Sequence, residues 1–277
     1  MTRLWNDFKT TMLMSALMGL CLGVGYLLGG RSALLPALLI GGVMNILAYF
    51  FSDRIALATV GARAIGPDDD PVLWRTVEEL SSRAGLPMPK VCVSPAPAPN
   101  AFATGRNPRH SAVCVTAGLR RMLSDDELAG VIGHELSHVK HRDILISTIA
   151  AVVAGAISYL TYISFRFGGR DENRHPAVAL LMLLLAPLAA GLIQMAISRS
   201  REYSADEAGA RLCGSPRSLA GALEKLASAS RRIPLPVPDA QANMFIVAPL
   251  TGAEMASWFM THPPTEKRIA KLLAMEA

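Results

Sequence analysis

The residues with the clearest chemical potential lie in the segment 131–138, which contains His134-Glu135-x-x-His138. Residues four apart in a helix lie on one face, so both imidazoles can bind one metal ion. Glu135 lies one position round the helix, where it can take a proton from water on that ion and later pass it to a leaving amine. This arrangement is typical of zinc proteases, although a solvated amphipathic helix can match the short pattern by chance.

The helix that carries this motif has a clear predicted start. Ser124-Asp-Asp-Glu127 forms a capping box, with acidic residues in the first helical turn. No Gly or Pro lies between Glu135 and Ser147. We therefore expect the helix to run through Asp143 straight into the apolar segment that follows, which would place the metal close to a membrane.

The composition is unlike that of an ordinary soluble protein. Of 277 residues, 51% are hydrophobic and only 18% are charged. Each of four charge-free segments is long enough to cross a bilayer as a helix: Thr10–Gly30, Ser32–Ser52, Ile144–Phe165 and Pro176–Ser198. Asn45 and Gln194, which lie within these spans, are expected to make polar contacts between helices. About 170 residues remain outside the segments 1–53 and 144–198 that contain these spans, enough for one water-soluble domain.

The first two spans should form a retained helical hairpin rather than a signal peptide, because a complete second span follows the tight link at residues 29–32. The cationic residues that flank the spans predict that both chain ends lie in the cytoplasm. A net charge of +5, spread over these flanks, gives no reason to expect nucleic-acid binding. Anionic lipid headgroups are sufficient partners for it.

Ahead of the motif, the chain should form a helix over Pro71–Ala84, ended by Gly85, and two strands, Lys90–Ser94 and Ser111–Thr116. A small sheet is the simplest arrangement. The segment between these strands contains Asn100, Ala101, Phe102, Ala103 and Thr104. An edge strand beside the metal can pair with extended substrate, but an ordinary hairpin strand is an equal alternative. Cysteines 21, 92, 114 and 213 lack metal-site spacing and are expected to be small buried thiols. A disulfide between Cys92 and Cys114 is the alternative, which a cytoplasmic location disfavours.

Two histidines leave a zinc ion short of one protein ligand. His141 lies on the same helix and cannot easily complete a tetrahedron with them. After the fourth span, Glu202 and Asp206 share a helix face. Glu202 can bind zinc while Asp206 accepts the free N–H of a ligand histidine, although both could also be solvated charges at a membrane boundary.

These features together resemble the HtpX-type membrane zinc metallopeptidases, relatives of the CAAX prenyl protease. The resemblance covers nearly the whole chain, and it includes a late His262-Pro-Pro segment followed by Arg268. It implies that His134, His138 and Glu202 bind one Zn²⁺ per chain and that Glu135 is the general base. It also implies that His262 stabilises the oxyanion, with Asp206 and Arg268 in supporting positions.

The resemblance implies a mainly α, α+β fold: four transmembrane helices and a cytoplasmic zincin-like domain with a small β-sheet. Its parts are an N-terminal transmembrane hairpin (1–53), the first part of the protease domain (54–143), a second hairpin (144–198) and the second part (199–277). The implied function is proteolysis of damaged or misassembled membrane proteins at the cytoplasmic side of a bacterial inner membrane, as quality control under stress. A catalytically inactive four-span scaffold or binding protein is the alternative, and no oligomeric state is predicted.

Overall fold

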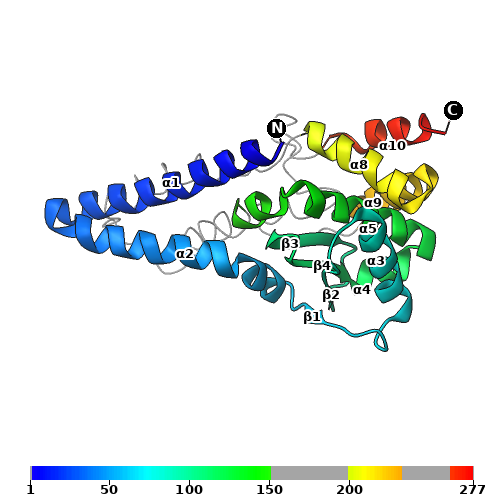
Figure 1. Cartoon of the computed structure of the whole chain (residues 1–277), viewed down its shortest axis with the longest axis horizontal. Coiled ribbons are helices and arrows are strands. Elements are labelled where there is room, and N and C mark those ends of the chain that lie inside the picture. The colour runs from blue at the N-terminus through cyan, green and yellow to red at the C-terminus, as the bar shows by residue number, and fades with distance from the viewer. Residues whose placement is uncertain (1, 151–198, 233–262, 277) are drawn as a thin grey trace.

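The computed structural model describes residues 2–150, 199–232 and 263–276 (Figure 1). Their elements, in chain order, are α1 (Thr2–Gly29), the 3-10 helix η1 (Gly30–Ala33), α2 (Leu34–Thr59), β1 (Arg63–Ala64), α3 (Pro71–Ala84), β2 (Lys90–Ser94), β3 (Ala101–Asn107), β4 (His110–Thr116), α4 (Ala117–Met122), α5 (Asp125–His141), α8 (Arg199–Cys213), α9 (Pro216–Arg232) and α10 (Thr265–Leu273). Residues 144–150 are also helical. The predicted helix at 71–84 and the two predicted strands are confirmed.

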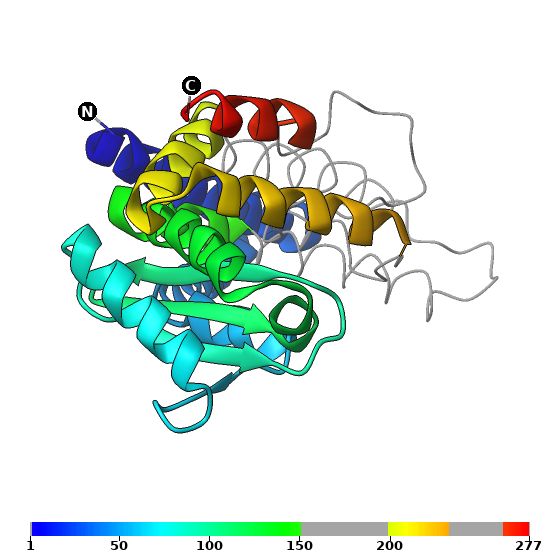
Figure 2. The same ribbon diagram turned by 90° about the vertical axis from the view of Figure 1, so that its right-hand side faces the viewer.

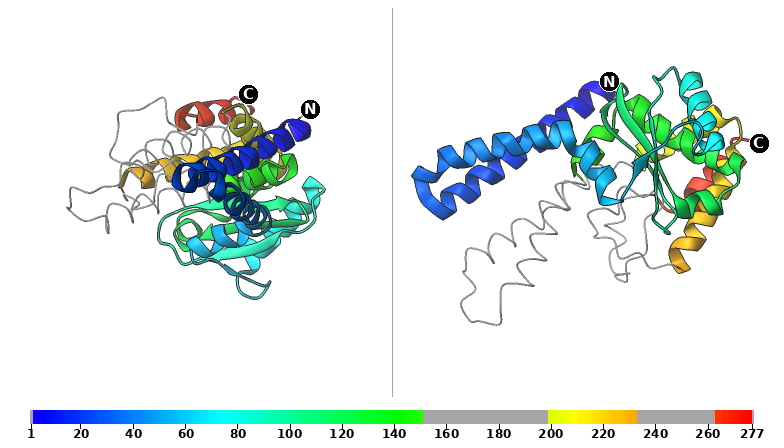
Figure 3. Two further views of the ribbon diagram at one scale, coloured as in Figure 1. Left: turned by 90° about the vertical axis from the view of Figure 1, so that its left-hand side faces the viewer. Right: turned by 90° about the horizontal axis from the view of Figure 1, so that it is seen from below.

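Helices α1 and α2 form a long hairpin that projects from the rest of the molecule (Figures 1 and 3). The predicted tight link is present as η1, where Gly30 adopts a φ of 58°. Asn45 Nδ2 donates a hydrogen bond to the Met14 carbonyl oxygen at 3.1 Å, so the predicted polar contact between helices is confirmed for Asn45. Gln194 lies outside the described residues.

Among the described residues, one helix has the length and composition needed to cross a membrane. It spans Gly30–Thr59 and has a mean hydropathy of 2.0. The predicted spans at 144–165 and 176–198 lie mostly or wholly outside the described residues.

The four strands form one mixed sheet in the order β1-β2-β4-β3. β2 and β4 are parallel, whereas β3 and β4 form an antiparallel hairpin. The predicted small sheet is thus confirmed, and β3 is an edge strand within the part of the chain that the structure describes. Cys92 and Cys114 are register partners on neighbouring strands, and both are buried free thiols, as predicted.

Helices pack on both faces of the sheet (Figure 2), and alternate residues of the strands face two different cores. On one face, Val91, Val113 and Val115 pack with apolar residues of α3, α5 and α9. On the other face, Cys92, Phe102 and Cys114 pack against the end of α2 and the residues just after it. The sheet is therefore held directly against the end of an apolar helical hairpin.

Helix α5 begins as predicted but does not continue as predicted. Ser124 and Glu127 form both hydrogen bonds of the capping box. The expected continuous helix through Asp143 is wrong, because α5 ends at His141 and Arg142 adopts the left-handed conformation with a φ of 60°. This break turns Asp143 back toward α5, where its carboxylate contacts His138. The next helical segment starts at residue 144.

Small residues on α5 allow two neighbouring helices to approach its backbone closely. A Cβ at Gly133 would lie 2.8 Å from the Gly209 carbonyl oxygen of α8. A Cβ at Gly130 would lie 2.8 Å from the backbone nitrogen of Leu219 in α9. This close approach sets the position of α8 relative to α5, and α8 carries both Glu202 and Asp206.

Candidate metal centre

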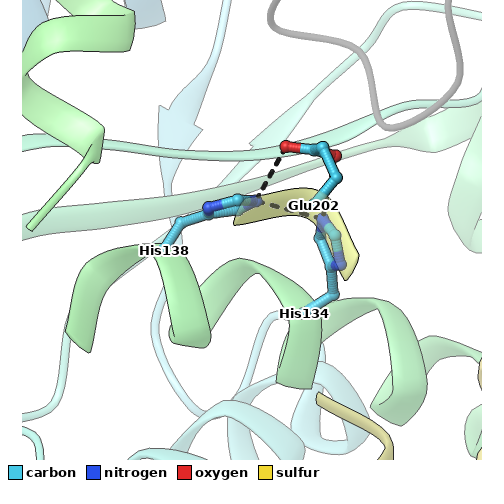
Figure 4. A group of neighbouring side chains, drawn as sticks. All are labelled: His134, His138 and Glu202. Atoms are coloured by element: carbon cyan, nitrogen blue, oxygen red, sulfur yellow. Dashed lines mark hydrogen bonds and ion pairs between the residues drawn. The ribbon is translucent and has the colours of Figure 1, made fainter. Parts of the chain in front are cut away.

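Two histidines of α5 and one glutamate of α8 point toward one another (Figure 4). The Nε2 atoms of His134 and His138 are 3.1 Å apart. Glu202 places Oε2 at 3.8 Å from the His134 nitrogen and Oε1 at 3.6 Å from the His138 nitrogen. His134 and Glu202 are buried, while His138 is partly exposed.

These separations fit a zinc ion. A tetrahedral site with bonds of about 2.0–2.2 Å places neighbouring ligand atoms about 3.3–3.6 Å apart. The observed separations of 3.1, 3.6 and 3.8 Å lie close to that range. Two imidazoles and a carboxylate are also a donor set that catalytic zinc uses, with a fourth position left for water or substrate. His141 is not a member of this group.

A buried aspartate and a buried arginine support His134. Asp206 Oδ1 lies 2.9 Å from His134 Nδ1, so it is placed to accept the proton of the nitrogen that faces away from the metal position. Arg268 donates two hydrogen bonds to Asp206, at 2.8 and 2.7 Å. Burial opposes ionisation of Asp206, but the hydrogen bonds and charge of Arg268 outweigh it and lower the pKa of this carboxyl. Asp206 therefore stays ionised beside His134.

A second aspartate supports His138 in the same way. Asp143 Oδ2 lies 3.2 Å from His138 Nδ1, and Asp143 is buried. Arg201 Nη1 lies 4.0 Å from the same carboxylate oxygen. Each motif histidine thus directs one nitrogen to the metal position and the other to an aspartate that lies near an arginine.

The carboxylate of Glu135 lies between α5 and the edge strand. Its Oε2 accepts a 2.8 Å hydrogen bond from the backbone N–H of Ala103, at the side of β3 away from β4. Burial raises the pKa of Glu135. This effect is larger than the opposite effects of His134, His138 and the Ala103 N–H, which lower the pKa. A raised pKa brings a carboxylate closer to the neutral range in which a general base works best.

The electrostatic surroundings favour a cation. Burial by itself lowers the pKa of His138, but Asp143, Glu202 and Glu135 reverse this effect and raise the pKa to about 10. The same negative field that favours an imidazolium favours a divalent ion between these side chains.

Comparison with known proteins agrees with this geometry. Residues 67–276 match Peptidase family M48. The chain belongs to peptidase family M48. Among its M48 relatives are proteins named Protease HtpX homolog from Paraburkholderia phytofirmans (49% identity, covering 98% of each chain) and Pyrococcus furiosus (51% identity, covering 97% of this chain and 96% of the relative). The HtpX-type resemblance predicted from the sequence is confirmed, and the chain is a metalloprotease by family.

A solved structure has a fold similar to that of this chain. The crystal structure of S. mikatae Ste24p aligns with 98% of this chain at a TM-score of 0.52 and 18% sequence identity. This chain spans about two thirds of the Ste24p chain (66%). At this identity the comparison supports a common fold and nothing finer.

The structure brings most of the predicted site residues of this M48 chain together. His134, Glu135, His138, Glu202, Asp206 and Arg268 converge through the contacts given above. Ala101, Phe102, Ala103 and Thr104 lie in β3, directly after Asn100. His262 lies outside the described residues.

Sequence reasoning gave no role to Asp143 or to the glycines that pack α5 against α8. The signal for Asp143 was an aspartate five residues after the second motif histidine, at a membrane boundary. The signal for Gly133 and Gly209 was a glycine within each of two predicted helices that had to meet.

Proposed function

We propose that this protein is an integral membrane zinc endopeptidase that cleaves damaged or misassembled membrane proteins at the cytoplasmic surface. The observation that carries the proposal is the set of zinc-compatible donor atoms on His134, His138 and Glu202, next to a buried carboxylate and an apolar helical hairpin. Family membership supports proteolysis. The names of the HtpX relatives support the same activity.

The residues divide the work of peptide hydrolysis between them. His134, His138 and Glu202 would hold one zinc ion, which lowers the pKa of bound water and polarises a carbonyl. Glu135 takes a proton at its carboxylate and returns it to the amine that leaves. Asp206 and Asp143 keep the two imidazoles oriented, and Arg268 keeps Asp206 ionised.

The edge strand gives this site a way to bind extended polypeptide of varied sequence. A substrate that pairs with the edge of β3 that no described strand covers forms main-chain hydrogen bonds, which require no particular side chains. The N–H of Ala103 at that edge already points to Glu135. A paired substrate would therefore pass beside the base. By its resemblance to the family, His262 would stabilise the oxyanion.

The proposal is tested by metal-dependent hydrolysis. The full chain, purified in mild detergent, should degrade unfolded casein, lose that activity with a zinc chelator and regain it when Zn²⁺ is added back. An inactive scaffold is the alternative, and it would show no hydrolysis at any zinc concentration. Fragments of membrane proteins that accumulate in cells with the wild type but not with Glu135→Gln would identify natural substrates.

The contact between His138 and Glu202 supports the proposal that both halves of the site lie on one side of the membrane. His138 and Glu202 meet, and the two proposed spans of residues 144–198 lie between them, so the chain must return to the same side of the membrane. Reporter tags at Asp69 and Pro238 should both lie in the cytoplasm, and a tag at Asp171 should lie outside. Opposite compartments for Asp69 and Pro238 would contradict the proposed topology.

A further inference from the structure

Strand β3 connects the candidate metal centre with two apolar helical segments. At Ala103 it contacts the base through the hydrogen bond to Glu135. One residue later, the hydroxyls of Thr104 and Thr148 lie 3.0 Å apart, and both side chains are buried. Thr148 donates its own proton to the Ile144 carbonyl oxygen, so Thr104 is the donor in the hydroxyl pair. The strand is thus fixed to the helical segment 144–150.

The far end of β3 contacts the second half of α2. The guanidinium carbon of Arg106 lies 5.4 Å from the centre of the Phe50 ring. Arg54 lies over the neighbouring Phe51 ring at the same distance of 5.4 Å. Both rings are exposed, at 47% and 40%. Asp53 and Arg54 are the first charged residues after the apolar part of α2, and cations that flank a span are typical of the boundary between lipid and water.

Beyond Arg106 the chain forms a short cationic turn, residues 106–110, here named the β3–β4 tip. Asn107 Oδ1 accepts hydrogen bonds from the backbone N–H groups of Arg109 and His110, at 3.0 and 3.1 Å, which fixes the turn. Arg109 and His110 are exposed, and Arg106 is half-buried. Among the described residues, neither arginine of the tip forms an ion pair within 4 Å.

The charge near the tip is positive. Arg54 of α2 adds a third arginine to Arg106 and Arg109. Asp53, beside Arg54, is the one acidic residue in the segments 50–54 and 106–110. Arginine binds phosphate with two parallel hydrogen bonds, and each arginine near an anionic lipid surface strengthens association about fivefold.

We propose that the β3–β4 tip lies on the anionic phospholipid headgroups of the membrane that α2 crosses, so that β3 accepts polypeptide segments directly beside the bilayer. The proposal rests on the proposed function, because it requires α2 to span a membrane. Ala103 and Arg106 are three residues apart, which is about 10 Å along a strand. Substrates would thus be cleaved about three residues beyond the point where they leave the bilayer.

Photocrosslinking tests the contact. The full chain is reconstituted in vesicles that contain phosphatidylglycerol with a photoactivatable headgroup, and crosslinked peptides are mapped by mass spectrometry. We expect crosslinks at the β3–β4 tip and at residues 50–54. Arg106→Gln/Arg109→Gln should lower the yield at the tip by about 5- to 25-fold, from about fivefold per arginine. Arg75→Gln/Arg121→Gln removes the same charge from α3 and α4, which lie away from the α1–α2 hairpin (Figure 1), and should leave that yield unchanged.

The outcomes separate the two proposals. Crosslinks at 50–54 without crosslinks at the tip would overturn the tip contact while leaving the membrane span intact. No crosslinks at either place would overturn both the contact and the span.

A separate cleavage experiment tests how far from the bilayer substrates are cut. A model substrate with one transmembrane segment and an unstructured polar tail is cut in the same vesicles, and the bonds are mapped. The bond nearest the bilayer should lie about three residues from the end of the span. A nearest bond about ten residues out or more would place the site about 30 Å from the lipid and would overturn the proposal.

Discussion

Replacement of Gly209 by alanine should weaken zinc binding while the chain remains folded. An added Cβ would lie 2.6 Å from the backbone nitrogen of His134, whereas ordinary contacts start at 3.4 Å. The backbone of α5 cannot rotate away as a side chain can, so the helices must separate by most of that 0.8 Å difference. Because α8 carries Glu202 and α5 carries both histidines, the separation would act directly on the ligand set.

The size of the effect follows from two opposing contributions to stability. Overpacking costs about 1–3 kcal/mol, whereas alanine in place of glycine stabilises a helix by about 1 kcal/mol. The chain should therefore remain folded. A misplacement of about 1 Å within a catalytic site, in contrast, costs about 100-fold in rate. We expect zinc affinity and casein hydrolysis both to fall steeply while the thermal unfolding temperature changes little.

A matched substitution in α9 controls for the change of residue type. Gly221→Ala adds the same methyl group to a helix, but the nearest atom, at 3.2 Å, is a side-chain oxygen, Oε1 of Glu127, and not a backbone atom. Zinc affinity is measured for both variants by competition with a chelator, and circular dichroism reports the fold. If Gly209→Ala binds zinc as tightly as Gly221→Ala and the wild type, close packing of α5 and α8 does not set the geometry of the centre.

Three other substitutions test two supporting residues and the third zinc ligand. Asp143→Ala leaves His138 without its orienting carboxylate and should weaken zinc binding by about 10–100-fold in chelator competition; unchanged affinity would remove Asp143 from the site. Arg268→Met leaves the buried Asp206 carboxylate without its cation and should lower the free energy of unfolding by about 3–5 kcal/mol in a denaturant titration. Recovery in Arg268→Met/Asp206→Asn would confirm that cause, and no loss in the single variant would exclude it. Glu202→Ala should strip zinc and abolish hydrolysis, whereas retention of the metal would show that another residue is the third ligand.

Local sequence patterns were sufficient for the elements that carry most of the site. The capping box at Ser124 placed the start of α5, and proline and glycine placed both ends of α3. The spacing of His134 and His138 in α5 placed two imidazoles on one face. Each of these signals lies within a few residues of the structure that it determines.

The break after α5 could not be predicted from the sequence, because one of the contacts that accompany it joins residues far apart in the chain. Neither Arg142 nor Asp143 is a helix breaker of the kind that glycine or proline is. The left-handed Arg142 is accompanied by contacts of Asp143 with His138 and with Arg201. Arg201 lies beside Asp143 in the structure, but the segment 151–198 separates the two residues in the sequence.

The close packing of glycines between helices could not be predicted from local patterns either. Gly133 and Gly209 each reduce helix propensity when considered alone. Their effect is seen only in the packed structure, where the absence of a side chain lets the backbones of α5 and α8 approach closely. Arg268 and Asp206 are 62 positions apart, so no local pattern links them, and the family resemblance alone pointed to Arg268.

The most direct test of a zinc centre served by a separate general base is to measure bound zinc and hydrolysis on the same preparation of Glu135→Gln. Glutamine preserves the size of the side chain but cannot take a proton. The arrangement of Glu135 beside three other donor residues predicts one zinc ion per chain in both the variant and the wild type, with hydrolysis lost only in the variant. Wild-type hydrolysis by Glu135→Gln, or a wild-type chain that binds no zinc, would contradict the account.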